Sequence, residues 1–546
     1  MFSIFQQFRD KWLLLPLLAL VLFMNKPFHI DDAVFLRSAD NLPYTLVGEA
    51  SGPVEFNGFL FEDLSPYEST HPPLIPYFLK LLGVFQPEEG YRFWAYHFFF
   101  LVFPILGIYY MRQLLRGEKT YAVAFLVLSP LFFVNATNLM ADVPMTVLWI
   151  GCIAELVAFD RNSDRSALLR MGILLWLALM TAYQSLALIP LLLCYILLRR
   201  RYAAISPLVF ASGFFLIFLM IVYKLNGYFP ILRPTVGIHI NSLVEMGSQN
   251  KYLVHKMLAM PICLGQGLFF LTPFLLRDLE DRQRFGFLIG ALSGTFLLFE
   301  YVTSQGHTLG YHPWELIVLR LLAYVGLLWI LVLLVRFARF VYAFTKTERG
   351  TRQGLSLVCY FWFFGVLFYN LVLMPYISAR YLLPAIPPAL LLFFGREHEY
   401  APRSLNWGLA IAGLTSLFLA SVDYGQARAD LHFFRQLSQR IEQPQNFYFS
   451  EDHGLYRYLK DMGANYLPSD VHQLAQGSMV LLSNNRLSPK LMKTMDRREE
   501  FELKGFYGFS LHHAPSRTGY YCSHDGLLPF SHPGSLKKAY LCEVVR

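Results

Sequence analysis

The stretch WLLLPLLALVLFMNKPFHIDDA, residues 12–33, places an apolar run directly before two adjacent carboxylates. With its flanking residues, the run is long enough to form a first membrane-spanning helix. Asn25 and the residues after it are poor substitutes for the small residues of a signal-peptide cleavage site, so we expect the helix to be retained. Asp31 and Asp32 then follow it at the membrane surface, where carboxylates are costly to keep without a function.

Composition places the chain among multi-pass membrane proteins. Of its 546 residues, 55% are hydrophobic and only 15% are charged, and the mean hydropathy is +0.41. A soluble protein of this length needs far more polar surface. The net charge of +8 is weak evidence for nucleic-acid binding, because the Lys and Arg residues form short clusters between apolar runs, as topology determinants do.

Apolar runs predict about thirteen membrane-spanning helices. The predicted spans are 12–26, 92–111, 120–139, 143–159, 168–182, 185–198, 203–223, 257–276, 285–303, 314–335, 354–374, 381–395 and 405–422. Basic clusters fall in every second loop, whereas the alternate loops are poor in Lys and Arg. The positive-inside rule therefore predicts a cytoplasmic N-terminus, and the odd number of spans predicts an extracytoplasmic C-terminal domain.

Two parts are predicted along the chain. Residues 1–422 form the membrane part, whose first outside loop, 27–91, carries the acidic pair and a short interfacial helix over 72–85. Residues 423–546 form a small extracytoplasmic α/β domain, because charge rises and apolar runs shorten to strand length. The expected strands are 446–450, 479–482, 506–509 and 539–545, and the expected helix is 455–462. Whether Cys522 and Cys542 form a disulfide there stays open.

The acidic residues near predicted membrane mouths have two interpretations each. One carboxylate of the pair Asp31-Asp32 can deprotonate an acceptor hydroxyl while the other orients the reacting centre or binds a cation. Alternatively, both acids begin a surface helix, where they suit the positive end of the helix dipole. Asp142, in a short outside turn before Pro144, is either a further catalytic acid facing the same pocket or a helix N-cap.

Two candidate phosphate-binding residues lie in other outside segments. His71 precedes two prolines, and it either hydrogen-bonds a phosphate or sugar or caps the helix that follows. Arg380 is the one basic residue of its short turn, and its forked guanidinium suits a phosphate or pyrophosphate. The alternative for Arg380 is extension toward lipid headgroups. The further candidates for lining this pocket are Tyr311, His312 and Tyr381.

In this order, the motifs resemble those of the GT-C superfamily of polytopic glycosyltransferases, in particular the bacterial relatives of protein O-mannosyltransferases and of lipid A aminoarabinose transferases. Four segments carry the resemblance: Asp31-Asp32, the HPPL segment His71–Leu74, the turn Asp142–Pro144 and the RYLLP segment Arg380–Pro384. The family often has Asp-Glu at the acidic pair, and the shorter Asp32 puts a role for the second acid in doubt.

The resemblance implies an inverting transfer of a sugar from a polyprenyl-phosphate donor to a hydroxyl of a lipid, glycan or protein. The reaction is expected on the outer face of a bacterial cytoplasmic membrane. Asp31 would be the base, Asp142 would help to bind donor or acceptor, and His71 and Arg380 would lie near the donor phosphate. Such enzymes differ in metal use, so dependence on a divalent cation stays open.

Two alternative functions compete with this one. A transporter or flippase of lipid-linked sugars typically shows paired repeats and charges near the bilayer midplane, whereas the charges here lie at mouths on one side. A surface-glycan ligase or polymerase would share the donor and differ in the acceptor. No P-loop, dinucleotide-binding or Cys/His metal motif occurs in the sequence, so none of these functions would use such a site.

Overall fold

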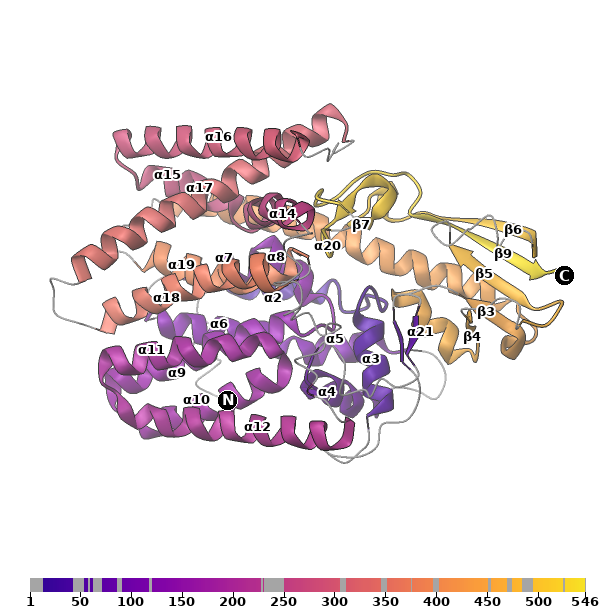
Figure 1. Ribbon diagram of the computed structural model, residues 1–546, viewed down its shortest axis with the longest axis horizontal. Helices are drawn as coiled ribbons and strands as arrows, with labels where there is room; N and C mark the ends of the chain where they lie inside the picture. Colours follow the sequence, from indigo (N-terminus) through magenta and orange to yellow (C-terminus); the bar gives the residue numbers. More distant parts are fainter. Residues whose placement is uncertain are drawn as a thin grey trace.

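A bundle of helices with a small sheet beyond one end makes up the computed structural model of the chain (Figure 1). It describes residues 13–42, 54–56, 59–61, 71–85, 91–116, 120–226, 229, 250–304, 311–344, 351–374, 376–395, 402–449, 453–468, 474–483, 494–523 and 526–545. The multi-pass helical class and the strand-containing C-terminal part expected from the sequence are both present.

Short elements make up the first part of the chain. They are helix α2 (Leu14–Val21), helix α3 (Asp32–Asn41), the antiparallel ribbon of β1 (Val54–Phe56) and β2 (Phe59–Phe61), and helix α4 (Leu74–Gly83). Helix α3 packs against α4 and, from the C-terminal part, against α21 (His453–Asp461). The helix expected over 72–85 is confirmed as α4, which begins after Pro73.

The first half of the bundle contains α9, the most deeply buried of the long apolar helices among the described residues. This half comprises α5 (Phe93–Phe100), α6 (Val102–Leu114), α7 (Thr120–Leu128), α8 (Pro130–Ala136), α9 (Asp142–Asn162), α10 (Arg165–Thr181), η3 (Tyr183–Ala187), α11 (Leu188–Arg199), η4 (Tyr202–Ala204) and α12 (Ile205–Asn226). The span expected at 120–139 is split into α7 and α8. Ser129 is extended there because the following Pro130 disfavours a helical residue before it.

The second half of the bundle is held together by close backbone contact. It comprises α14 (Asn250–Leu268), η7 (Phe269–Leu271), α15 (Thr272–Arg277), α16 (Asp281–Ser304), α17 (Pro313–Phe344), α18 (Thr351–Phe368), η8 (Tyr369–Leu373), η9 (Arg380–Ala385), α19 (Ile386–Phe394) and α20 (Pro402–Ser438). A Cβ on Gly326 of α17 would lie 2.0 Å from the Pro261 carbonyl oxygen of α14. A Cβ on Gly265 of α14 would likewise lie 2.1 Å from the Leu322 carbonyl oxygen. The two helices can approach this closely because both residues lack a side chain.

Eight helices within the described residues are long and apolar enough to cross a membrane. They correspond to the predicted spans that begin near 92, 143, 203, 257, 285, 314, 354 and 405. The other five predicted spans fall on shorter or broken helices, namely α2, α7–α8, α10, η3–α11 and η9–α19. The total of thirteen spans therefore stays a prediction.

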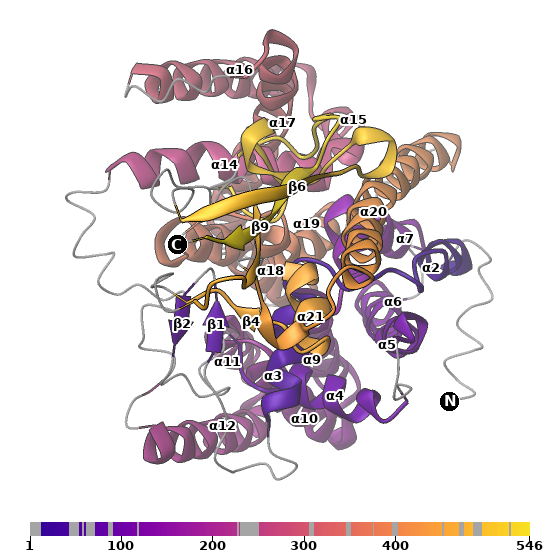
Figure 2. The same cartoon turned by 90° about the vertical axis from the view of Figure 1, so that its right-hand side faces the viewer.

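A five-stranded mixed sheet forms the core of the C-terminal part, with strand order β4-β3-β5-β9-β6. Its strands are β3 (Phe447–Phe449), β4 (Asn465–Tyr466), β5 (Met479–Ser483), β6 (Met495–Leu503) and β9 (Lys537–Val544). One face packs on the end of α20 and on α21 through Leu437, Leu455 and Leu459. Figure 2 looks onto this end, with β6, β9 and α21 in front of the bundle.

Three of the four expected strands and the expected helix are confirmed as β3, β5, β9 and α21. The prediction of a strand at 506–509 is wrong. The residues form η13 (Phe506–Gly508), with Tyr507 at φ 48°. Phe506 packs closely on α20, because a Cβ added to Gly425 of that helix would lie 2.4 Å from the Cβ of Phe506. This contact draws the segment to the helix and away from the sheet.

Two further features concern the C-terminal part. Helix α20 runs from Pro402 to Ser438 without a break, so it crosses the expected domain boundary at 422 and joins bundle and sheet. Cys542 is a buried free thiol, so the disulfide with Cys522 is not formed in the described structure.

Candidate functional site

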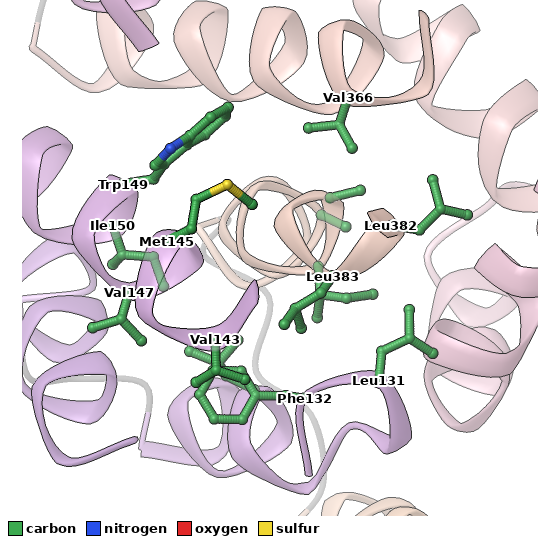
Figure 3. Packing of buried hydrophobic residues seen from close by; sticks show 14 of the residues in the cluster. Leu131, Phe132, Val143, Met145, Val147, Trp149, Ile150, Val366, Leu382 and Leu383 are labelled. Carbon is green, nitrogen blue, oxygen red and sulfur yellow. The ribbon is translucent and has the colours of Figure 1, made fainter. Parts of the chain in front are cut away.

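Arg380 begins the short helix η9, which is wedged into the centre of the bundle. Leu382 and Leu383 have no exposed surface, and Figure 3 shows them among apolar side chains of α8, α9 and α18. The interior of a protein is close-packed, so η9 cannot rotate without opening a cavity. The guanidinium of Arg380, which is only 7% exposed, is therefore held in a defined place at the end of the bundle.

The structure brings Asp31 and Arg380 together across 349 residues of sequence. Arg380 Nη1 donates to Asp31 Oδ2, and the same nitrogen lies 2.9 Å from the Met140 sulfur. Nη2 donates to the Tyr381 hydroxyl at 3.3 Å, and the guanidinium carbon lies 5.0 Å from the centre of the Tyr381 ring. Nε is buried without a hydrogen-bond partner in the described structure. The guanidinium thus keeps one donor for a further anion.

Asp31 is presented by a strained turn. Ile30, directly before it, has φ 47°, which is rare for a β-branched residue and carries an energetic cost. Asp31 then occupies the N-cap position of α3, and its carbonyl oxygen accepts from Val34 N at 2.9 Å. Its side chain does not cap the helix. The carboxylate instead points to Arg380 and is 24% exposed, so it is accessible to a substrate.

Asp142 is the first residue of the buried helix α9, with Pro144 in the first turn, whereas Ala141 occupies the N-cap position, so the N-cap interpretation of Asp142 is wrong. The carboxylate is 5% exposed and lies close enough to Arg380 and Asp31 to interact electrostatically with both. One arginine therefore faces two carboxylates, one from the turn before α3 and one from the start of α9.

His71 lies beside the same group. Its ring is 5.2 Å from the ring of Phe35 on α3, and it interacts electrostatically with Arg380 and Asp31. Burial, assisted by the Arg380 charge, lowers the pKa of His71 to about 4. The imidazole is therefore neutral at pH 7, when it can donate one hydrogen bond and accept another.

Asp32 has different partners from its neighbour Asp31. Its side chain has no exposed surface, and its two oxygens accept from backbone N–H groups of Leu139 at 2.7 Å and His29 at 3.1 Å. Burial raises its pKa to about 6, although Lys26 and the two hydrogen bonds oppose the rise. The Asp32 carboxylate thus ties the turn before α3 to the turn that leads into Asp142.

The three aromatic candidates divide between two places. Tyr381 belongs to the Arg380 group, and its hydroxyl lies 3.0 Å from that of Tyr376. Tyr311 accepts from Leu527 N at 2.9 Å, and no described contact joins it to Arg380. His312 is exposed, and its backbone N–H donates to Glu315 as α17 begins. Tyr311 therefore belongs to the contact with the C-terminal part, and the described contact of His312 lies at the start of α17.

A buried polar cluster near this site was not predicted from the sequence. Lys26 and Asp423 have no exposed surface and form an ion pair, and Lys26 Nζ also donates to Asn138 Oδ1. The Tyr521 hydroxyl donates to Asp423 at 2.7 Å, and His29 Nε2 lies 3.3 Å from the other Asp423 oxygen. The available signal was that Lys26 is a cation at the outer end of the first predicted span, 12–26, against the positive-inside pattern.

The C-terminal part also holds the turn that carries Arg380. Ala379 N donates to Tyr520 O at 3.2 Å, and Ser523 N donates to Ile377 O at 3.0 Å. Ser523 Oγ accepts from Ile377 N at 3.2 Å. The backbone directly before Arg380 therefore pairs with residues 520–523, so the C-terminal part helps to hold the site in place.

A metal centre is not evident in the described residues, where no group of three or more His, Cys, Asp or Glu side chains is placed to hold an ion. Asp31 and Asp142 are the two carboxylates of the site, and both face Arg380. The guanidinium of Arg380 supplies a positive charge at this site.

Comparison with known proteins gives similarities only to solved structures. No protein-family model matches the sequence, and no curated protein matches it. The chain is similar to ArnT from Cupriavidus metallidurans bound to undecaprenyl phosphate, with 13% identity and a TM-score of 0.40 over 89% of this chain and 95% of that one. It is also similar to the apo state of that ArnT, with 12% identity and a TM-score of 0.42 over 98% of this chain and 97% of that one.

Proposed function

We propose that the chain is an inverting glycosyltransferase, which moves a sugar from a polyprenyl-phosphate donor to a hydroxyl of a lipid, glycan or protein acceptor. The reaction would take place at the outer face of a bacterial cytoplasmic membrane, with the N-terminus in the cytoplasm and residues 423–546 outside. The observation that carries the proposal is the pairing of Asp31 with the buried Arg380, beside Asp142 and His71. The donor class follows the resemblance of the four motifs that hold these residues.

Arg380 is suited to the donor phosphate. Its Nε is free of a protein partner within the described residues, and a phosphate oxygen can bind there and at a neighbouring Nη in a forked geometry. The guanidinium is almost fully buried, where its charge acts more strongly than in water. It would therefore stabilise the negative charge that grows on the phosphate as the sugar leaves.

Asp31 is suited to be the general base. Arg380 holds its carboxylate before substrate arrives, and a phosphate that binds Arg380 would compete for the same guanidinium. The released carboxylate would take the proton of the acceptor hydroxyl. The acceptor oxygen then forms a bond to the anomeric carbon on the face opposite the phosphate, and the bond from that carbon to the phosphate oxygen breaks. The phosphate leaves with the electron pair, which gives inversion.

Asp142 and His71 complete the pocket. Asp142 would accept hydrogen bonds from sugar or acceptor hydroxyls, and it interacts electrostatically with the same arginine. His71, neutral at pH 7, can donate to a phosphate oxygen without adding charge. Asp32 is a positioning residue, because its oxygens bind backbone groups and no surface is left for a substrate.

Sugar transfer in membranes tests the proposal. Membranes would carry the wild type, Asp31→Asn or the control Asp281→Asn at matched expression, and a lipid extract would serve as donor source. Asp281 is a matched control because its side chain is 95% exposed and α16, which it begins, has no part in the site. The wild type and the control should consume a polyprenyl-linked sugar and form a glycosylated product, whereas Asp31→Asn should lose at least about 100-fold of the rate.

Two results would overturn the proposal. If Asp31→Asn transfers sugar as fast as the wild type, Asp31 is not the base. If no lipid pool supports transfer while vesicles containing the wild type move a lipid-linked sugar across the bilayer, the chain is a transporter. The size of the product separates a single transfer from ligation or polymerisation of a surface glycan.

A further inference from the structure

A second hollow lies at the end of the bundle opposite Arg380. It is a cavity of about 740 Å³, lined at the last turn of α9 by Arg161 and at the end of α19 by Gly395. The same two helical segments begin at the other end with Asp142 and Arg380. The 21 residues of α9 span about 30 Å at about 1.5 Å per residue, which is the thickness of a bilayer core. The cavity and the proposed active site therefore lie at opposite membrane surfaces.

The cavity is strongly basic. Four arginines line it, namely Arg116, Arg161, Arg336 and Arg339, against one carboxylate, Asp278. Arg161 donates from Nη1 to the Gln113 carbonyl oxygen at 3.4 Å, and its Nε is buried without a partner in the described structure. Charged donors that are withdrawn from water need an anion or an acceptor to satisfy them.

Topology alone does not account for these arginines. A residue that only marks the cytoplasmic side can point into water, as Arg165 and Arg282 do at the same end of the bundle. Arg336, in contrast, is 8% exposed although it stands near the end of a long helix. Turning arginines into a cavity costs solvation energy, which a bound anion would offset.

The rest of the lining is apolar. Leu114, Leu279, Phe287, Phe340 and Leu391 form walls beside the arginines. A volume of this size is typical of sites for small organic ligands. A basic mouth joined to apolar walls at a membrane surface matches a molecule that has an anionic head and a hydrocarbon tail.

We propose that this cavity binds the phosphate group of an anionic membrane lipid on the face predicted to be cytoplasmic. Arg116 and Arg339, which are exposed at the rim, and the more deeply placed Arg161 and Arg336 hold the phosphate. The acyl chains lie along the leucine and phenylalanine walls. The site is separate from the proposed active site and does not depend on the transfer reaction.

Native mass spectrometry of the full chain in detergent tests the site. The probes are phosphatidylglycerol, phosphatidylcholine and, in a separate arm, inorganic phosphate. The rim variant is Arg116→Gln/Arg339→Gln, and the control is Arg165→Gln/Arg282→Gln, which removes two exposed arginines outside the cavity. The midpoint of unfolding of each variant checks that it is folded.

The wild type and the control should retain phosphatidylglycerol in preference to phosphatidylcholine. Each arginine near a lipid phosphate changes binding about fivefold, so the rim variant should bind about 25-fold more weakly. Inorganic phosphate that binds the wild type and not the rim variant, with no lipid retained, would support the same phosphate site with a soluble ligand. Equal retention of phosphatidylglycerol by the rim and control variants would overturn the proposal. A wild type that binds neither phosphatidylglycerol nor inorganic phosphate would also overturn it.

Discussion

Replacing Lys26 with methionine tests the buried cluster that supports the proposed active site. Methionine keeps most of the length of the lysine stem but removes the charge. Lys26 and Asp423 both have no exposed surface, so the variant leaves the Asp423 carboxylate buried without its cation. Breaking a buried pair in this way costs about 3–5 kcal/mol of unfolding free energy. Tyr521 and His29 still contact Asp423, which places the expected cost toward the lower end of that range.

The measurement is unfolding in mixed micelles by added sodium dodecyl sulfate, followed by circular dichroism. Lys504→Met is the matched control, because Lys504 is 68% exposed and lies 3.8 Å from Glu502. A surface pair of this kind is worth about 1 kcal/mol or less. The double variant Lys26→Met/Asp423→Asn removes both buried charges, so it should recover about 2–3 kcal/mol relative to the sum of the single changes.

The same variants also test whether the buried cluster supports the geometry of the proposed active site. Tyr521 is adjacent to Tyr520, whose carbonyl pairs with Ala379, so loosening the cluster should displace the turn before Arg380. Sugar transfer should fall in Lys26→Met and partly return in the double variant. The reasoning is refuted if Lys26→Met costs no more than Lys504→Met, or if the effects of the two buried changes simply add.

Three further predictions concern the site and its supports. Arg380→Lys keeps the charge but loses the fork, so kcat/KM for the donor should fall about 100-fold or more, and a rate equal to wild type in a donor titration would contradict phosphate binding by Arg380. Ser523→Ala leaves the Ile377 N–H without its acceptor, which costs about 1–3 kcal/mol of unfolding free energy. It should raise the KM for the donor more than it lowers kcat. Initial rates that do not change over a series of donor concentrations would contradict the support of this turn by residues 520–523. The pKa of Asp32 is raised to about 6 by burial, so the folded chain binds more protons than the unfolded chain between about pH 4 and 6, and this carboxylate lowers stability as pH rises through that window. Asp32→Asn should therefore gain up to about 3 kcal/mol relative to wild type between pH 4 and pH 7 in unfolding experiments, and a difference that does not change with pH would disprove the shift.

Local sequence patterns predicted much of the architecture. Apolar runs marked every long helix of the bundle, because a bilayer requires about 20 consecutive apolar residues whatever the neighbouring helices do. Short alternating runs located β3, β5 and β9 for a similar reason, since each strand has one buried face. Strand β6, Met495–Leu503, was not predicted because six of its nine residues are charged and do not alternate with apolar ones.

Within the candidate site, local chemistry identified Asp31, Asp142, His71 and Arg380, and the structure places all four in one group. It did not identify which acid of the pair faces Arg380. That depends on the turn at Ile30, whose φ of 47° directs Asp31 and Asp32 to different partners. A backbone angle of this kind is decided by tertiary packing and has no signature in an apolar residue.

By itself, then, the sequence determined a multi-pass helical protein with charged residues at the ends of its helices, because hydrophobicity and charge act within a few residues of chain. Tertiary structure alone decided that Lys26 meets Asp423 across 397 residues, that residues 520–523 brace Arg380, and that arginines from three segments line one cavity. These contacts join segments that are distant along the chain, and their free energy depends on packing and burial that exist only once the bundle has formed.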